Sequence, residues 1–205
     1  MGRILLVTLG VITGCQVHTH VTQYNAPSAW LEAQNPTIAS THIFLIHGLD
    51  PLDLGNMQGL QQGLIQIGYT DTKLYQFYQL SSVMEDVQRI KTECPESKIV
   101  LIGYSAGAES AAIITNRLHD QSGIDVDCLF YLSGVTLINS EFHHPDYVDR
   151  IINIRDAKLP LLGMRLDGAE NYWLTDTFHY RSPTHPRTLE ILQRELDLLR
   201  YAEGR

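Results

Sequence analysis

The residues with the clearest chemical potential form a Gly-x-Ser-x-Gly segment from Gly103 to Gly107, with Ser105 at its centre. A continuous apolar run over residues 99–102 precedes it, and an alanine-rich stretch that favours helix follows. A serine in this context is typical of a tight strand-to-helix turn that presents its hydroxyl as a nucleophile. The amide of Ala106 would then point at any oxyanion formed there. The alternative is a turn that only joins a strand to a helix.

A second turn carries further chemistry. His47 and Gly48 follow the apolar residues 41–46, and Leu49 and Asp50 come next. A His-Gly turn after a strand, with a strand-borne Gly-x-Ser-x-Gly about 55 residues later, resembles the α/β-hydrolase superfamily. The resemblance is at the level of motifs and covers residues 41 to about 201. It implies that the loop after the first strand supplies a second oxyanion amide, which by position is that of Leu49, with Asp50 as the neighbouring possibility.

The same resemblance indicates where the catalytic acid should lie. In the superfamily the acid comes just past a strand that follows the nucleophile, and its carboxylate holds the catalytic imidazole in one tautomer. Residues 150–155 read as such a strand, and Asp156 stands at its end. Asp167 and Asp176 remain alternatives, because they lie in an irregular stretch, residues 159–177, in which we predict no element.

The resemblance also indicates the catalytic base. The histidine of the superfamily lies in a loop before a terminal amphipathic helix, which points to His179, with His185 as the alternative. The imidazole would accept the serine proton and return it to the leaving group. The chain order Ser105, Asp156, His179 matches the order of serine, acid and histidine in the superfamily.

These side chains require an alternation of strands and helices to position them. Apolar runs and helical periods predict five strands and four helices in alternating order. This order favours an α/β fold with a doubly wound, mostly parallel sheet. The resemblance implies a minimal version of the α/β-hydrolase fold. Ser82 and Glu85 suggest a capping box at the start of the second helix. The expected strands are residues 41–46, 72–78, 99–102, 129–132 and 150–155. The expected helices are residues 56–66, a helix capped at Ser81 and Ser82 and stopped by Pro95, the alanine-rich stretch after the Ser105 turn, and a terminal helix with the apolar stripe Leu189, Leu192, Leu196 and Leu199.

Length and charge limit the function classes. The chain has 205 residues, 44% of them hydrophobic and 19% charged, which suits one globular domain, here residues 41–205. The formal net charge is −8, and without a basic cluster a nucleic-acid partner is not expected. The loop over residues 135–149 is too short for a helical lid, so we expect an open site. Its pair His143 and His144 reads as a solvated loop rather than a metal site.

The N-terminus resembles a bacterial lipoprotein signal. Arg3 is followed by an apolar core over residues 4–12 and by small residues before Cys15. The resemblance implies a signal peptide over residues 1–14, lipid on Cys15, a polar tether over residues 15–40, and a bacterial cell-envelope location. The residue after Cys15 is not Asp, which favours the outer membrane. The alternative is an N-terminal strand that ends at a buried cysteine.

Export would leave Cys94 and Cys128 as an even pair in an oxidising compartment. Cys94 precedes the strand that leads to Ser105, and Cys128 begins the next predicted strand. Because parallel neighbours start at the same edge of a sheet, we expect the two to be able to form a disulfide, with buried free thiols as the alternative.

The sequence as a whole predicts a serine hydrolase that cleaves carboxylic esters or thioesters through an acyl-enzyme on Ser105. We expect a small ester or acyl substrate, contact with a membrane through Cys15, and no metal or organic cofactor. The alternatives are an amidase or peptidase with the same residues, or a non-catalytic surface lipoprotein that kept the fold.

Overall fold

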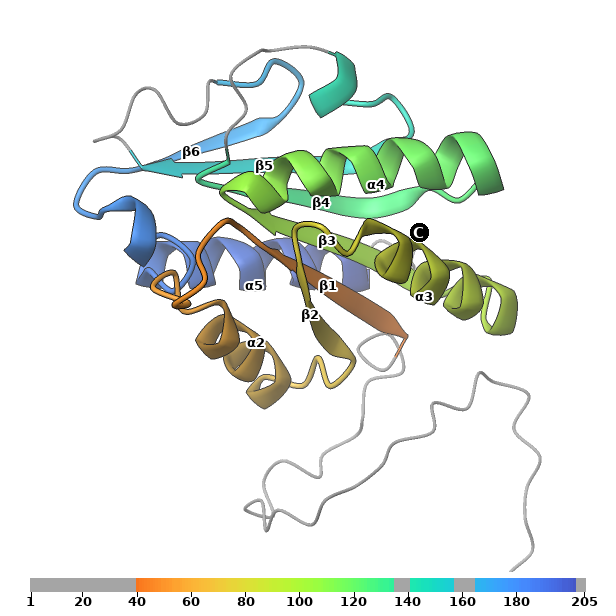
Figure 1. Cartoon of the computed structure of the whole chain (residues 1–205), viewed down its shortest axis with the longest axis horizontal. Coiled ribbons are helices and arrows are strands. Elements are labelled where there is room, and N and C mark those ends of the chain that lie inside the picture. Colours follow the sequence, from red (N-terminus) through yellow and green to blue (C-terminus); the bar gives the residue numbers. More distant parts are fainter. Residues whose placement is uncertain (1–39, 135–140, 157–164, 202–205) are drawn as a thin grey trace, which may run out of the picture.

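The computed structural model describes residues 40–134, 141–156 and 165–201. They form one six-stranded sheet in the order β2-β1-β3-β4-β5-β6, and every neighbouring pair is parallel. Helices α2 and α5 cover one face and α3 and α4 the other (Figure 1). The predicted α/β fold with a doubly wound sheet is confirmed. The strands are β1 (Thr41–His47), β2 (Thr72–Gln76), β3 (Lys98–Tyr104), β4 (Val126–Leu132), β5 (Val148–Asp156) and β6 (Glu170–Leu174).

The helices follow the predicted positions. They are α2 (Met57–Gln66), α3 (Leu80–Glu93), α4 (Ala106–Ser122) and α5 (Pro186–Tyr201), with short 3-10 turns η2 (Glu141–His143) and η3 (His179–Arg181). The capping box predicted for α3 is wrong. The helix begins at Leu80 after an N-cap at Gln79 that makes no side-chain capping bond, so Ser82 lies inside the first turn. None of the described helices is both long and apolar enough to cross a membrane.

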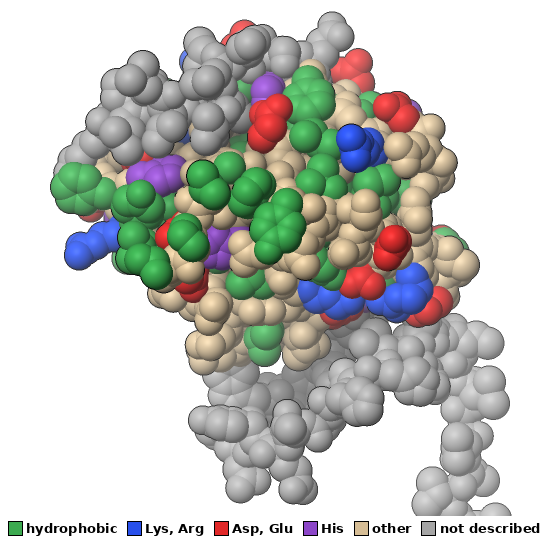
Figure 2. Space-filling model, viewed as in Figure 1, with side chains coloured by type: hydrophobic (Ala, Val, Ile, Leu, Met, Phe, Trp, Pro, Cys, Tyr) green, Lys and Arg blue, Asp and Glu red, His purple; other side chains and the backbone are tan. Residues whose placement is uncertain are grey.

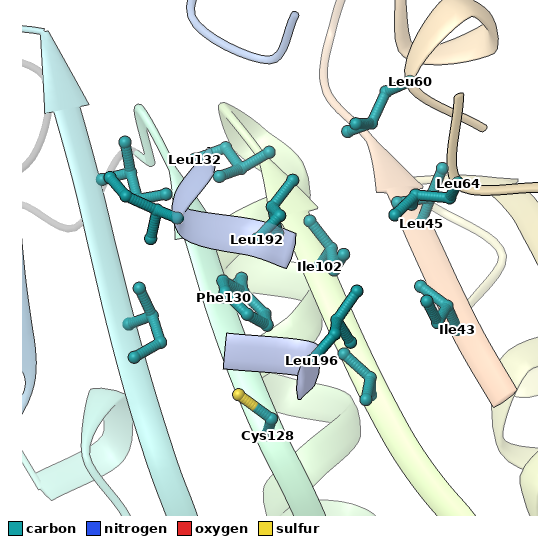
Figure 3. Close-up of a cluster of buried hydrophobic side chains, with 14 of the residues drawn as sticks. Ile43, Leu45, Leu60, Leu64, Ile102, Cys128, Phe130, Leu132, Leu192 and Leu196 are labelled. Atoms are coloured by element: carbon teal, nitrogen blue, oxygen red, sulfur yellow. The ribbon is translucent and has the colours of Figure 1, made fainter. Parts of the chain in front are cut away.

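The central strands are continuous apolar runs because they are buried on both faces. On β1, Ile43 and Leu45 face α2 and α5, whereas Phe44 and Ile46 face α3 and α4. Figure 3 shows the first of these layers, in which side chains of α2 and α5 pack onto β1, β3 and β4. Edge strand β6 escaped prediction because its residues are mostly half-buried or exposed and show no apolar alternation.

The predicted disulfide between Cys94 and Cys128 is wrong, since Cys128 is a buried free thiol. Its side chain points into the layer beneath α5 (Figure 3). Cys94 is the C-cap of α3, a helix that packs on the opposite face of the sheet. The sheet itself therefore separates the two positions. The signal, lipidation and tether predictions for residues 1–39 lie outside the described residues.

Candidate active site

Ser105 occupies a strained turn between β3 and α4. Its φ of 53° and ψ of −120° lie where a residue with a side chain is rarely found. Two glycines make the turn possible. A Cβ on Gly107 would lie 2.2 Å from the carbonyl oxygen of Ile46, and one on Gly103 would lie 2.4 Å from the carbonyl oxygen of Gly107. The turn therefore holds the Ser105 hydroxyl at the carboxyl edge of the sheet, half-exposed, at the N-terminus of α4.

The loop after β1 comes directly against this turn. A Cβ on Gly48 would lie 2.7 Å from Cβ of Ser105 and 3.4 Å from the amide nitrogen of Ala106. The amide of Asp50 donates to the carbonyl of Gly48 at 2.9 Å, whereas among the described residues the amide of Leu49 has no hydrogen-bond acceptor. The amide of Ala106 opens α4, where the first N–H groups have no acceptor inside the helix. Both amides proposed for an oxyanion are thus close to Ser105, and of the two loop candidates only Asp50 is already engaged.

His179 meets Ser105 from the other side of the site. Its Nε2 lies 3.0 Å from Oγ of Ser105, which is hydrogen-bonding distance, although 74 residues separate them. The ring stacks on Tyr104, with centroids 5.1 Å apart. The carbonyl of His179 accepts from the Tyr104 hydroxyl at 3.3 Å and from the Ser182 hydroxyl at 2.8 Å. The Ser133 hydroxyl in turn donates to Oγ of Ser182. This network fixes the backbone and the ring of His179 together.

Tyr104, Ser133 and Ser182 were not singled out in the sequence. Tyr104 is the first variable position of the Gly-x-Ser-x-Gly segment, and Ser133 follows the end of β4 at the same edge of the sheet. Their position at strand ends was the only available signal, because their contacts with the His179 segment cross 75 and 49 residues of chain.

Asp156 lies behind His179 at the end of β5. It is completely buried, and one carboxylate oxygen lies 3.8 Å from Nδ1 of His179, an ion-pair distance that is longer than a hydrogen bond. Pairs of this kind often tighten in the substrate complex. The alternatives lie elsewhere. Asp176 is exposed and pairs with His185 at 3.3 Å, and Asp167 is exposed and lies 4.0 Å from Arg165.

Burial controls the protonation of His179. Desolvation lowers the pKa of His179 below its usual 6.5, and the negative charges of Asp156 and Asp50 oppose that shift only in part. A group buried without full compensation favours its neutral form. The imidazole is therefore neutral at pH 7, the form that can accept a proton from Ser105.

Three side chains beneath the loop after β1 form a group with metal-binding potential. The nearest ligand atoms of His47, Asp50 and Asp53 lie within 4.8 Å of one another. These atoms already hold the loop, however. Oδ1 of Asp53 lies 2.9 Å from Nε2 of His47 and accepts the Met57 amide, and Asp50 accepts the Gly55 amide at 2.6 Å. We attribute the group to the shape of the loop and not to a cation.

A second serine, histidine and aspartate meet at the opposite edge of the sheet. Nδ1 of His42 is hydrogen-bonded to the carboxylate of Asp71, and Nε2 of the same ring lies 3.2 Å from Oγ of Ser97. Ser97 is only 1% exposed, so no substrate can reach its hydroxyl. The group ties the start of β1 to the segments before β2 and β3.

The expectation that His143 belongs to a solvated loop is wrong. His143 is buried, its Nε2 lies 2.8 Å from Oε2 of Glu109, and its carbonyl accepts the Tyr131 hydroxyl at 2.9 Å. These contacts dock η2 against the first turn of α4 and the end of β4. His143 is thus a packing residue.

The fold is similar to that of solved α/β hydrolases. The esterase domain of a Rhodothermus marinus protein matches with a TM-score of 0.53 at 12% identity, covering 80% of this chain and 88% of that chain. Human thioesterase 2 matches with a TM-score of 0.51 at 9% identity, covering 80% of this chain and 97% of that chain. At such identities the likeness establishes the fold alone. No protein-family model matches the chain, and neither does any curated protein.

Proposed function

We propose that this chain is a serine hydrolase that cleaves carboxylic esters or thioesters through an acyl-enzyme on Ser105. The observation that carries the proposal is the 3.0 Å contact between Oγ of Ser105 and Nε2 of His179. Ser105 makes this contact from a strained turn at the carboxyl edge of the sheet. A positive φ at a serine costs free energy, and such strain is characteristic of functional sites. Ser97 also contacts a histidine and Ser133 also has a positive φ, but both are buried, whereas Ser105 combines the two features in a half-exposed residue.

In the proposed reaction His179 accepts the Ser105 proton while Oγ attacks the carbonyl carbon. The tetrahedral oxyanion receives hydrogen bonds from the amides of Ala106 and Leu49. Asp156 stabilises the imidazolium that forms and holds its Nδ1 toward the sheet. Collapse of the intermediate breaks the bond to the leaving alcohol or thiol, which takes the proton from His179.

The second half of the reaction repeats the first with water. His179, neutral again, removes a proton from a water molecule that attacks the acyl carbon, and the proton then passes to Oγ of Ser105 as the acid leaves. The groups that this chain contributes to these steps are side chains and backbone amides. The lowered pKa of His179 supports this role, since the base has to be unprotonated at the start of both halves.

The test uses p-nitrophenyl esters and the matching thioesters of increasing acyl length, with Ser105→Ala and His179→Ala as variants. Hydrolysis by the wild-type chain, lost in both variants, and labelling of Ser105 by a fluorophosphonate would support the proposal. Amide hydrolysis without ester hydrolysis would favour a peptidase. No turnover and no labelling would refute the serine hydrolase and leave a non-catalytic binding protein.

We also propose that Cys15 carries lipid and holds the domain on a bacterial membrane, on the strength of the apolar segment and the small residues before it. The mass of the N-terminal peptide from the chain expressed in bacteria tests this. A diacylglyceryl cysteine at the mature N-terminus is the expected result, and an intact Met1 would refute it.

A further inference from the structure

The loop between β1 and α2 has an inverted arrangement of polar and apolar side chains. Asp50 and Asp53 turn inward, where Asp50 accepts the Gly55 amide and Asp53 accepts the Met57 amide. Leu52 and Leu54 turn outward and are 78% and 55% exposed. A loop that faces water normally does the reverse, because apolar surface is costly to hydrate and carboxylates are not.

The loop holds this arrangement against its own conformational preference. Asp53 has a positive φ of 48° and Asn56 one of 52°, the left-handed region that residues with side chains adopt only at a cost. Nε2 of buried His47 lies 2.9 Å from Asp53, and the same aspartate oxygen accepts the Met57 amide. Several contacts therefore lock the leucines outward.

Other exposed apolar side chains continue this surface around the nucleophile. We call the whole set the apolar rim. Tyr78 lies just past the end of β2, and Phe178 and Tyr180 flank the histidine that contacts Ser105. Figure 2 shows hydrophobic side chains gathered on the side of the molecule where the loop after β1 and the segment before α5 lie. The rim, each member of which is between 51% and 78% exposed, consists of Leu49, Leu52, Leu54, Tyr78, Phe178 and Tyr180.

We infer that the apolar rim docks the chain onto an uncharged or zwitterionic lipid surface, from which an acyl ester enters the Ser105 site. The inference rests on the proposed function and narrows its substrate to acyl lipids. Concentrated exposed apolar area marks an interaction surface. A protein partner or a second copy seated on the rim would cover the nucleophile, whereas a lipid surface brings the ester to it.

Charge and side-chain type favour such a lipid surface. The net charge of −8 works against an anionic membrane, and the rim itself carries no charged side chain. Its two tyrosines combine an apolar ring with a polar tip, which suits the boundary between headgroups and acyl chains. Asp176 and Arg181 flank the aromatic pair with opposite charges, so they add no net charge there.

The test compares vesicle binding and turnover in the chain from Gln16 onward, so that neither the lipid on Cys15 nor the apolar segment before it contributes. Leu52→Asp and Leu54→Asp are the rim variants. The matched control is Leu198→Asp, a leucine that is 44% exposed in the last turn of α5, the helix whose first residue follows the His179 segment. Binding to phosphatidylcholine vesicles is measured by sedimentation with Ser105→Ala added, which separates docking from turnover. Turnover is measured on a soluble short-chain ester and on a long-chain ester held in the vesicles.

We expect each rim variant to lower vesicle binding and turnover of the vesicle-held ester about tenfold, since each withdraws one leucine from the lipid. Turnover of the soluble ester should stay within about twofold, and Leu198→Asp should behave as wild type. Equal losses in the control variant, or wild-type binding no stronger than that of the rim variants, would overturn the inference. So would a wild-type dimer that Leu52→Asp turns into a monomer. If the chain without rim substitutions does not hydrolyse the soluble ester at all, that result would instead refute the proposed function.

Discussion

Replacing the buried acid behind His179 tests the proposed mechanism most directly. Asp156→Asn keeps the shape of the side chain and removes its charge. For unit charges 3.8 Å apart, Coulomb's law at an effective dielectric constant of about 20 gives about 4 kcal/mol of stabilisation of the imidazolium. That energy corresponds to about a thousandfold in rate. Loss of the correct tautomer adds to it, so we expect kcat to fall by about 10³- to 10⁴-fold.

The pH profile separates this electrostatic role from a merely structural one. The Asp156 charge raises the pKa of His179 against the larger effect of burial, so its removal lowers that pKa further. Because the base has to be neutral, rate rises with pH through the pKa of His179. The acid limb of the residual activity in Asp156→Asn should therefore lie at lower pH than in the wild type.

The assay is hydrolysis of p-nitrophenyl acetate between pH 4 and 9, with the urea midpoint confirming that each variant is folded. Asp176→Asn and Asp167→Asn are the matched controls, and both should stay within about twofold of wild type because both side chains are exposed. The reasoning fails if Asp156→Asn keeps kcat within tenfold of wild type, or if Asp176→Asn shows the large loss instead.

Three further predictions concern stability and reactivity. Gly107→Ala should lower the free energy of unfolding by about 3 kcal/mol or more, because its Cβ would meet a β1 carbonyl at 2.2 Å. Gly63→Ala, which has open space, should raise it by about 0.5–1 kcal/mol in the same urea titration, and a tolerated Gly107→Ala would contradict the turn geometry. The hydrogen bond from His42 lowers the pKa of Asp71, so this contact stabilises the fold above the unfolded pKa of Asp71 and is lost as pH falls through the lower folded value. Chemical denaturation between pH 2 and 6 should therefore show a shallower acid loss in Asp71→Asn than in the wild type, and identical slopes would contradict it. Burial raises the pKa of Cys128 well above its usual value, so this thiol should resist iodoacetamide in the native chain and react on unfolding; mass spectrometry showing native labelling would refute its burial.

The sequence predicted the fold well because its signals are local. Continuous apolar runs identified the buried strands, and the Gly-x-Ser-x-Gly turn gave the junction of β3 and α4. Edge strand β6 lacks such a run, because one of its faces stays near solvent. The predicted disulfide failed for a related reason. Chain position gave the edge at which Cys94 and Cys128 should lie, but not that Cys128 points into the layer beneath α5 while Cys94 ends a helix on the other face of the sheet.

The candidate site shows the same division between local and distant information. Residue types and chain order pointed to Ser105, Asp156 and His179, and the structure brings these three side chains together. What orients His179 could not be predicted, because the Tyr104 hydroxyl reaches its carbonyl across 75 residues of chain and Ser133 reaches Ser182 across 49.

The inverted loop after β1 shows why composition alone did not reveal the apolar rim. Leucines alternate with aspartates in this loop, and nothing in their order says which side chains face water. The direction is set by hydrogen-bond demand. The turn leaves the amides of Gly55 and Met57 without backbone acceptors, and Asp50 and Asp53 satisfy them by pointing inward. The leucine side chains are therefore directed toward solvent, at the carboxyl edge of the sheet where Ser105 lies. The requirement that closes the loop is therefore also what places an apolar surface beside the nucleophile.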